Sequence, residues 1–140
     1  MMNKWIFAAG VLSSVTFGIH VFAGGSDVHE PLLATGLSAL LKTYISMLWH
    51  GVTAVLLINS AALLVAAFHR HLERPIVWAV VLQYIAYGGL FFGYGLAYLG
   101  TAWTTPQWLG FLAISILAMA GLRAGKHPSR RAKKYELLQG

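Results

Sequence analysis

The stretch YISMLWHGVTAVLLINSAALLVAAF, from Tyr44 to Phe68, contains no Asp, Glu, Lys or Arg. An apolar run of about 17–25 residues is long enough to cross the hydrocarbon core of a bilayer as a helix. Three further apolar segments follow the same pattern, at residues 5–23, 76–99 and 107–122. Because backbone amides in hydrocarbon must find their partners inside their own segment, the sequence predicts an all-α, four-helix transmembrane bundle over residues 1–122.

The composition of the whole chain agrees with this class. Hydrophobic residues make up 58% and charged residues 10% of the 140 residues, and the mean hydropathy is +0.67. Soluble domains carry about 25% charged residues. The sequence contains no cysteine, which excludes disulfides and thiolate-held clusters. The four apolar segments also contain no Asp or Glu, which argues against transport coupled to a buried carboxylate.

The Lys and Arg residues indicate how the predicted bundle is oriented, because loops rich in these residues stay in the cytoplasm. The connection HRHLERP (residues 69–75) carries Arg70 and Arg74. The tail at residues 123–140 carries six more basic residues: Arg123, Lys126, Arg130, Arg131, Lys133 and Lys134. Both segments are predicted to be cytoplasmic, so the topology is expected to be N-in/C-in. The tail is also expected to attract anionic lipid, and it lacks the interleaved aromatic residues that nucleic-acid binding would favour.

Reporter fusions can check this orientation. A reporter that is active only in the periplasm should be active when fused after Asp27 or Trp103, because both connections are expected outside. The same reporter should be inactive when fused after His71 or at Gly140, since basic segments are retained inside. An active fusion at Gly140 would contradict the four-span topology.

The first apolar segment also allows a different interpretation. MMNKW, followed by an apolar run that ends in Val21-Phe22-Ala23, has the layout of a cleaved signal peptide. Cleavage would leave three spans and remove His20. The run is longer than the usual h-region of about 7–15 residues, and it carries a helical pattern that a discarded segment would not need. The residues of that pattern share one face: Ala9, Ser13, Thr16 and His20. A retained first span is therefore expected, and a mature chain beginning at Gly24 would overturn it.

The segment GIHVFAGGSDVHEPLL (residues 18–33) places ionisable residues near the outer end of the first span. His20 lies about one turn before the diglycine, and His50 lies roughly 9 Å, or about two turns, into the second span. Both histidines are therefore expected at similar depth. Asp27, His29 and Glu30 are expected in a loop over the same end. The leucines among residues 31–42 predict a short interfacial helix that covers this end like a lid.

Five residues form the candidate ligand site: His20, His50, Asp27, His29 and Glu30. Intramembrane ionisable residues are costly, and their presence indicates function. His20 and His50 could be the two axial ligands of a b-type haem held between helices. They could instead hold a transition metal such as Zn, Cu or Fe(II), with Asp27, His29 or Glu30 as further ligands. The sequence leaves both cofactors open.

A purely structural interpretation of the same histidines is also open. Each could be satisfied by one hydrogen bond to a hydroxyl, for which the sequence offers Thr16, Ser46, Thr53 and Tyr94. The chain would then be a structural membrane subunit. Its Gly89-x-x-x-Gly93 spacing lets helices approach closely, either within the monomer or in a homodimer. A third possibility is a small permease or membrane enzyme whose substrate path is lined by an aromatic stripe of the third span: Tyr84, Tyr87, Phe91, Tyr94 and Tyr98.

Helical periodicity predicts which face of the second span turns inward. The small and hydroxyl-bearing residues on the face of His50 are expected to point into the bundle: Thr43, Ser46, Thr53, Ala54, Leu57 and Ala61. Asn59 lies away from this face, in the middle of the span. It is expected to donate a hydrogen bond to another helix.

His20, Pro31-Leu32-Leu33 and Trp49-His50-x-x-Thr53 follow one another over the first half of the chain. In this pattern the chain resembles a group of small, uncharacterised four-span bacterial membrane proteins. The resemblance implies that His20 and His50 belong to one recurring constellation, and it implies no activity. The leading hypothesis is therefore a multi-pass protein of the bacterial inner (cytoplasmic) membrane, which acts as an accessory or ligand-binding subunit of a redox or transport process. A larger membrane complex is compatible with this hypothesis.

Overall fold

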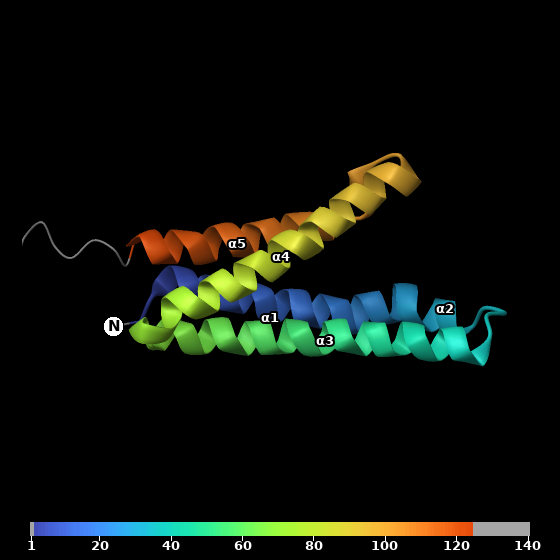
Figure 1. Cartoon of the computed structure of the whole chain (residues 1–140), viewed down its shortest axis with the longest axis horizontal. Coiled ribbons are helices and arrows are strands. Elements are labelled where there is room, and N and C mark those ends of the chain that lie inside the picture. Colours follow the sequence, from blue (N-terminus) through green and yellow to red (C-terminus); the bar gives the residue numbers. More distant parts are fainter. Residues whose placement is uncertain (1, 125–140) are drawn as a thin grey trace, which may run out of the picture.

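The computed structural model describes residues 2–124, and its described segments are helices joined by short turns (Figure 1). The first helical segment consists of α1 (Lys4–Gly24), a π-helical turn η1 (Gly25–His29) and α2 (Glu30–Leu33). It is followed by α3 (Ala39–Phe68), α4 (Arg70–Leu99), a short 3-10 turn η2 (Ala102–Thr104) and α5 (Gln107–Ala124). Four helical segments are long and apolar enough to cross a membrane. The four-helix membrane fold is therefore confirmed, while the N-in/C-in orientation stays a prediction.

The helices extend beyond the apolar segments from which they are predicted. α3 begins at Ala39 rather than at residue 44, because Ser38 caps it and accepts a hydrogen bond from the amide of Leu41 (3.4 Å). α4 begins at Arg70 rather than at residue 76, so His69 alone separates it from α3. Hydropathy marks the part of a helix that lies in hydrocarbon, whereas capping and backbone hydrogen bonds decide where the helix begins. The expected basic connection at residues 69–75 is thus mostly the first turns of α4.

The loop and the lid helix expected between the first two spans take a different form. Asp27 and His29 lie in η1, and Glu30 begins α2, so these three residues continue the first helix instead of forming a loop. The separate interfacial helix over residues 31–42 is not confirmed. Its first residues end the first helical segment at Leu33, and its last residues begin α3 at Ala39.

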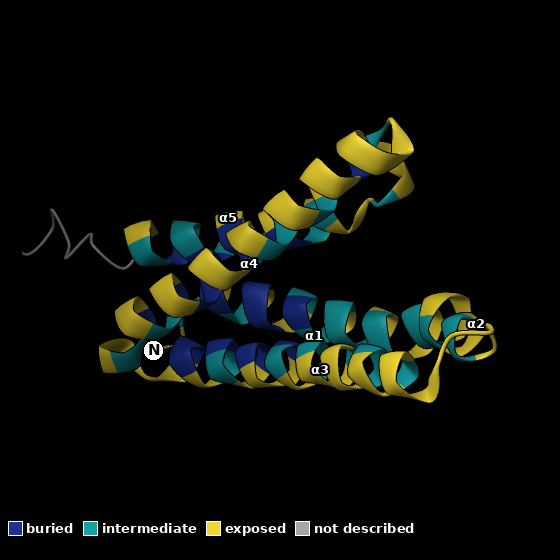
Figure 2. Cartoon of the chain, turned by 45° about the vertical axis from the view of Figure 1, so that its right-hand side comes forward, coloured by how far each residue is buried: buried dark blue, intermediate teal, exposed yellow. Residues whose placement is uncertain are grey.

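The helices form two antiparallel pairs that diverge towards one end. α1 lies along α3, and α4 lies along α5 (Figure 1). We call the end that holds the α3–α4 turn the His69 end, and the end that holds the turn between α2 and α3 the Gly36 end. α5 packs against α1 in the half next to the His69 end, and the two pairs separate towards the Gly36 end. Buried residues accordingly gather in the first of these halves (Figure 2). One half of the molecule is closed, and the other is open between the pairs.

A chain of buried hydroxyls holds three helices together in the closed half. Tyr84 of α4 bonds to Ser13 of α1, and Ser13 bonds to Ser60 of α3 (2.8 Å). Ser60 donates to the carbonyl of Leu56 (2.7 Å). Since each hydroxyl has one proton, the tyrosine donates to Ser13 and Ser13 donates to Ser60. All three side chains are buried, so the chain satisfies polar groups that would otherwise be costly in hydrocarbon.

The inward faces of α1 and α3 can be compared with the faces that helical periodicity selects in the sequence. Ala9 and Ser13, which share one face of the first span with Thr16 and His20, are fully buried, so this part of that face turns inward. The predicted inner face of the second span is wrong over most of its length, because Leu57 is 53% exposed and Ala54 and Ala61 are exposed as well. The residues of α3 that turn inward are these: Leu56, Asn59, Ser60, Leu63, Ala66 and Ala67. Asn59 donates to Gln83 Oε1 of α4 (3.5 Å), which confirms its predicted interhelical bond.

The glycines of α4 that pack inside the monomer are not Gly89 and Gly93. A β-carbon added at Gly89 or Gly93 would meet nothing within 4 Å among the described residues, so this pair does not pack inside the monomer. At Gly95 the corresponding β-carbon would lie 3.1 Å from the Cα of Ala102, where the chain folds back after α4. Gly88 faces Phe111 and the backbone of Trp108 in α5. Packing within the monomer therefore uses Gly88 and Gly95, and a role for Gly89 and Gly93 in a homodimer stays a prediction.

The aromatic stripe of α4 divides into a buried and an exposed part. Tyr84 is fully buried, whereas Tyr94 and Tyr98 are 61% and 76% exposed and stack on one another with ring centroids 5.3 Å apart. The buried end belongs to the core, and the exposed end lies near the Gly36 end. Amphipathic rings are common at the level of lipid head groups, and this part of the stripe fits such a position.

Candidate functional site

The π-helical turn η1 decides where His29 lies. In an uninterrupted α-helix, nine residues at 3.6 per turn place His20 and His29 on opposite faces. A π-turn accommodates one additional residue, which lowers the angle between them to roughly 80°. The amide of Glu30 bonds to the carbonyl of Gly25, five residues earlier. Pro31 favours this wider turn, because its ring would clash with the carbonyl four residues before it in a regular helix. His29 is thus turned towards α3, on the side of His20.

Trp49 of α3 lies between these two histidines. Its ring stacks on His20 with centroids 4.2 Å apart and on His29 with centroids 5.2 Å apart, at interplanar angles of 18° and 5°. A β-carbon at Gly24 would lie 3.0 Å from Cη2 of the indole. The edge of the indole therefore rests on the bare backbone of Gly24, midway along the helix from His20 to His29. We call these three rings the His–Trp–His stack.

Each histidine of the stack has a hydroxyl partner on α3. His20 Nε2 lies 3.1 Å from Thr53 Oγ1, and His29 Nε2 lies 3.1 Å from Ser46 Oγ. Thr53 Oγ1 donates its own proton to the carbonyl of Trp49 (2.9 Å), so it accepts from His20 Nε2–H. A neutral imidazole with its proton on Nε2 keeps Nδ1 as an acceptor. Of the hydroxyls considered from the sequence, Thr53 is thus found as a partner of His20, and Ser46 as a partner of His29 rather than of His50.

The remaining candidate residues do not gather around one point. His50 is exposed, and its ring meets His29 edge-on, with centroids 5.5 Å apart. The expected pairing of His50 with His20 is thus replaced by a pairing with His29, because the inward face of α3 differs from the predicted one. Asp27 is exposed and accepts from the hydroxyl of Ser26 (3.2 Å). Glu30 is exposed on the first turn of α2.

This arrangement gives no support to a metal site or a haem site. Among residues 2–124, no group of three or more His, Asp or Glu side chains is placed to hold a metal ion. The Nε2 of His20, a usual ligand atom, donates to Thr53, and one face of its ring is covered by Trp49.

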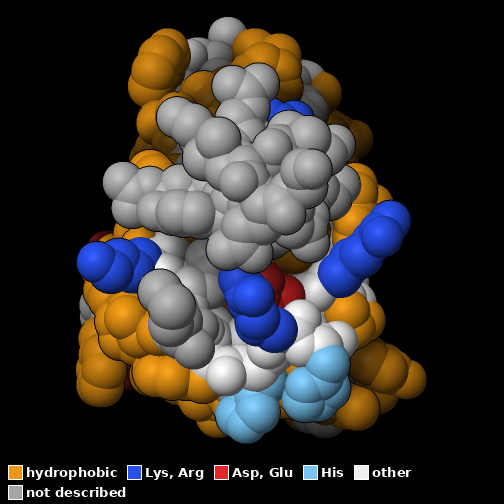
Figure 3. Space-filling view, turned by 90° about the vertical axis from the view of Figure 1, so that its left-hand side faces the viewer, with side chains coloured by type: hydrophobic (Ala, Val, Ile, Leu, Met, Phe, Trp, Pro, Cys, Tyr) orange, Lys and Arg blue, Asp and Glu red, His pale blue; other side chains and the backbone are white. Residues whose placement is uncertain are grey.

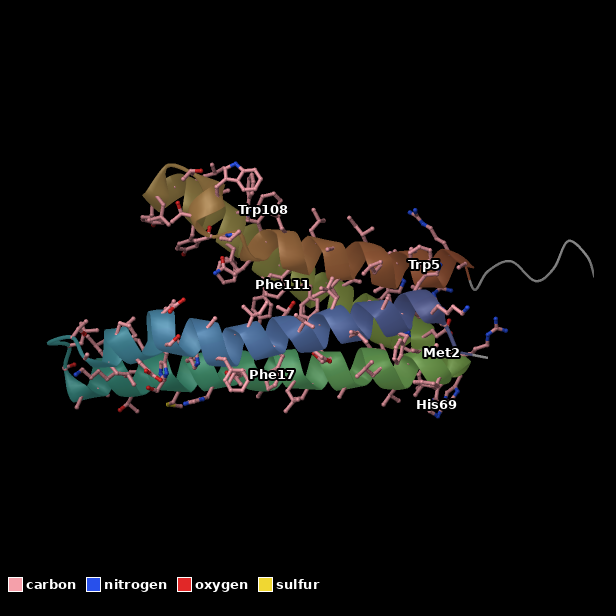
Figure 4. All side chains as sticks on the ribbon, turned by 180° about the vertical axis from the view of Figure 1, so that it is seen from behind. Met2, Trp5, Phe17, His69, Trp108 and Phe111 are labelled. Carbon is pink, nitrogen blue, oxygen red and sulfur yellow. The ribbon has the colours of Figure 1, made fainter. Side chains whose placement is uncertain are left out.

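A wedge-shaped groove of about 800 Å³ lies beside the stack, where the helix pairs diverge. His20, Asp27 and Trp49 belong to its wall on the side of α1 and α3. Tyr87 and Phe91 of α4, with Gln107 and Phe111 of α5, form the opposite wall. Phe111 points from α5 towards α1 (Figure 4) and contacts the rings of Tyr84, Tyr87 and Phe91. We call this space the wedge; its lining is mostly apolar, with a few polar groups near the Gly36 end.

Several residues of the wedge carry no signal in a single sequence. In the sequence, Gly24 follows the predicted first span and suggests the end of a helix. In the structure it is the last residue of α1, and its missing β-carbon makes room for Trp49. Phe111 and Gln107 come from the last span, which has no ionisable residue to single it out. The motif Trp49-His50-x-x-Thr53 is the one sequence signal that leads to this part of the molecule. Trp49 lines the wedge and Thr53 bonds to His20 of the stack, whereas His50 does not line the wedge.

Residues 2–124 form a fold with four helices long and apolar enough to cross a membrane, and a groove lies open between its two helix pairs. Comparison with protein-family models, with curated proteins and with solved structures found no match to the chain. The resemblance in the first half of the chain therefore stays a prediction.

Proposed function

We propose that this protein is an accessory subunit of the bacterial inner membrane that binds a lipophilic ligand in the wedge. The ligand has a flat, hydrogen-bonding head group and a long apolar tail, as isoprenoid quinones have. The observation that carries the proposal is the position of His20, whose side chain lines a mostly apolar groove and whose Nδ1 is an acceptor when Nε2 donates to Thr53. A polar group at that depth is costly unless it serves packing or function.

The size and the walls of the wedge fit this class of ligand. Its volume of about 800 Å³ lies within the range of roughly 300–1,000 Å³ found for small-molecule sites. Tyr87 and Phe91 of α4 supply aromatic rings in the wall against which a flat ring can pack. The wedge opens between helix pairs, so a ligand dissolved in the bilayer can enter from the side. With the N-in/C-in topology, it lies in the outer half of the membrane.

Two hydrogen-bonding groups in the wedge suit the two redox forms of such a head group. The acceptor Nδ1 of His20 fits a quinol hydroxyl, and the amide of Gln107 can donate to a quinone carbonyl. The protein would thus hold the carrier near a partner that oxidises or reduces it, which is the accessory role inferred from the sequence. No step of electron transfer is assigned to the chain itself.

A structural subunit without a ligand is the second candidate. It is favoured by the observation that His20 and His29 each already have a hydroxyl partner on α3. In that case the stack joins α1 to α3, and the wedge is filled by ordinary acyl chains.

A quinone titration distinguishes the two. We expect a 1,4-benzoquinone with a decyl tail to quench the fluorescence of Trp49 in the purified protein, with the Trp49→Phe variant giving the background from the other tryptophans. His20→Ala should weaken the binding of the quinol form about tenfold, because one hydrogen bond is worth about 0.5–1.5 kcal/mol and about 1.4 kcal/mol corresponds to a factor of ten.

Two controls accompany this titration. Thr53→Val, like His20→Ala, removes the hydrogen bond between His20 and Thr53, but it keeps the imidazole. The affinity of this variant for the quinol should therefore stay within about threefold of the wild type. His71→Ala, on the first turn of α4 at the other end, should leave the affinity unchanged. Equal affinity of the wild type and His20→Ala for the quinol form, or quenching in Trp49→Phe as strong as in the wild type, would leave the structural candidate standing.

A further inference from the structure

A second groove, of about 460 Å³, runs along the outside of the closed half. Val81 and Ile85 of α4 form one side, and the other side is a strip along α5. The members of that strip recur every three or four residues: Leu112, Ser115, Ile116, Met119, Ala120 and Arg123. Trp5 of α1 completes the groove near the His69 end. This groove is separate from the wedge, since the two have no lining residue in common.

The groove has the length of one leaflet. From Leu112 to Arg123 the strip on α5 rises by about 16 Å, at 1.5 Å per residue. Half of a hydrocarbon core of about 30 Å is nearly the same distance. The lining between these two residues is aliphatic except for Ser115, whose hydroxyl donates to the carbonyl of Phe111 (2.8 Å). The groove therefore offers an acyl chain an apolar bed from mid-membrane to the surface.

The end of the groove carries a cation and an indole. Arg123 lies in the last turn of α5 and is exposed, and Trp5 lies in the first turn of α1 and is half exposed. Close packing of α1 on α5 holds these two residues together: Asn3 Nδ2 donates to the carbonyl of Gly121 (3.1 Å), and a β-carbon at Gly121 would collide with Ile6. Arginine binds phosphate through two parallel hydrogen bonds, and tryptophan favours the level of lipid head groups.

The charge of the surrounding surface favours an anion. Figure 3 faces the His69 end and shows Lys and Arg side chains around its rim. Among residues 2–124, the basic residues of this end are Lys4, Arg70, Arg74 and Arg123, and the one acidic residue there is Glu73. A zwitterionic head group gains little from such a surface, whereas an anionic one is attracted by about 1 kcal/mol for each basic residue near it.

We propose that this groove is a specific site for an anionic phospholipid of the inner leaflet. One acyl chain lies along α5 between Leu112 and Ala120, and the phosphate is bound by the guanidinium of Arg123 beside the indole of Trp5. The site does not include the tail beyond residue 124. That part of the tail, for which the sequence predicts an affinity for anionic lipid, lies outside the described residues. The site also does not depend on the ligand proposed for the wedge.

Native mass spectrometry of the full chain in mild detergent tests this site. Dioleoyl phosphatidylglycerol should be retained at least fivefold more strongly than dioleoyl phosphatidylcholine, and Arg123→Gln should abolish most of this preference. Arg70→Gln is the matched control, because it removes the same charge from the same end but lies outside the groove. Ala120→Phe should fill the groove and weaken both lipids, while inorganic phosphate should not displace phosphatidylglycerol.

Two outcomes would overturn the proposal. Equal losses in Arg123→Gln and Arg70→Gln would mean that a diffuse positive surface, and not this groove, attracts the lipid. Equal retention of the two lipids by the wild type would mean that the head group is not recognised. His20→Ala should leave lipid retention unchanged, because His20 lies in the wedge and not in this groove. The proposal of a ligand in the wedge and the proposal of this lipid site can therefore fail independently.

Discussion

Replacing Gly121 by leucine should lower the free energy of unfolding by about 3 kcal/mol, the upper part of the range for overpacking a close contact. Gly121 is buried where α5 crosses α1, and a β-carbon there would lie 3.1 Å from the amide nitrogen of Ile6 and 3.1 Å from Asn3 Oδ1. Backbone atoms cannot rotate out of the way as a flexible side chain can. The leucine would thus force α1 and α5 apart at the closed end of the molecule.

Unfolding in detergent with increasing denaturant measures this effect. Gly51→Leu is the matched control, because Gly51 is also helical but has no described atom within 4 Å of a β-carbon placed there. It should change the free energy of unfolding by less than about 0.5 kcal/mol, as surface substitutions do. If both variants are equally stable, the close approach of α1 and α5 at Gly121 is wrong, and with it the position of Trp5 beside Arg123.

The fold is largely predictable from the sequence because hydrocarbon imposes few solutions. An uncharged stretch such as residues 44–68 has no stable alternative to a helix once it is in a bilayer. The ends of the helices are less predictable. Ser38 and Arg70 lie outside the apolar segments, and the hydrogen bonds that make them helix starts leave no mark in a hydropathy profile.

The inward faces are predictable only where polarity and packing agree. On α1 the small and polar residues are also the buried ones, so Ser13 points inward as expected. On α3 the strip of small residues through Ala54 and Ala61 faces outward, while Leu56 and Leu63 face inward. A bilayer accepts leucine and alanine equally well on the outside, so the hydrophobic pattern of a membrane helix does not decide its inner face.

The candidate site depends on a feature that the sequence does not announce. In GGSDVHEP the glycines and the proline are typical of a helix break, and only Pro31 favours the wider turn by which the helix continues; without that turn His29 would lie on the far side of α1 from His20. The prediction of a site near His20 therefore leads to the right end of the bundle, but the neighbours it names are only partly correct. Trp49 stacks on His20 and His29, and His50 meets His29, while a bound metal or haem stays a prediction.

The two halves of the molecule divide its tasks. In the half near His69, glycines and buried hydroxyls bring the helices into close contact. Towards the Gly36 end the helix pairs diverge, and the wedge lies between them. The wedge exists because the helices do not close on one another there, and the buried contacts gather in the other half. Tyr84 lies between the two, since it ends the hydroxyl chain and also contacts Phe111 of the wedge.

Tyr84→Ala should cause a loss of about 3–5 kcal/mol in the free energy of unfolding, as for other large aromatic residues cut back in a core. Tyr84 is fully buried, so its removal leaves a cavity beneath Phe111 and ends the chain of hydroxyls through Ser13 and Ser60. Tyr84→Phe keeps the ring and loses one interhelical hydrogen bond, which in membrane proteins is worth about 0.6 kcal/mol on average.

The comparison of these two variants separates packing from hydrogen bonding. In the same denaturant titration, Tyr84→Phe should lie close to the wild type and Tyr84→Ala far below it. Tyr98→Ala, on the exposed part of the same stripe, should be nearly neutral because its ring is 76% exposed. Phe111 loses its support in Tyr84→Ala, so quinone binding in the wedge should weaken together with stability. If Tyr84→Phe were as destabilised as Tyr84→Ala, the hydroxyl chain, and not the ring, would be what holds the closed half together.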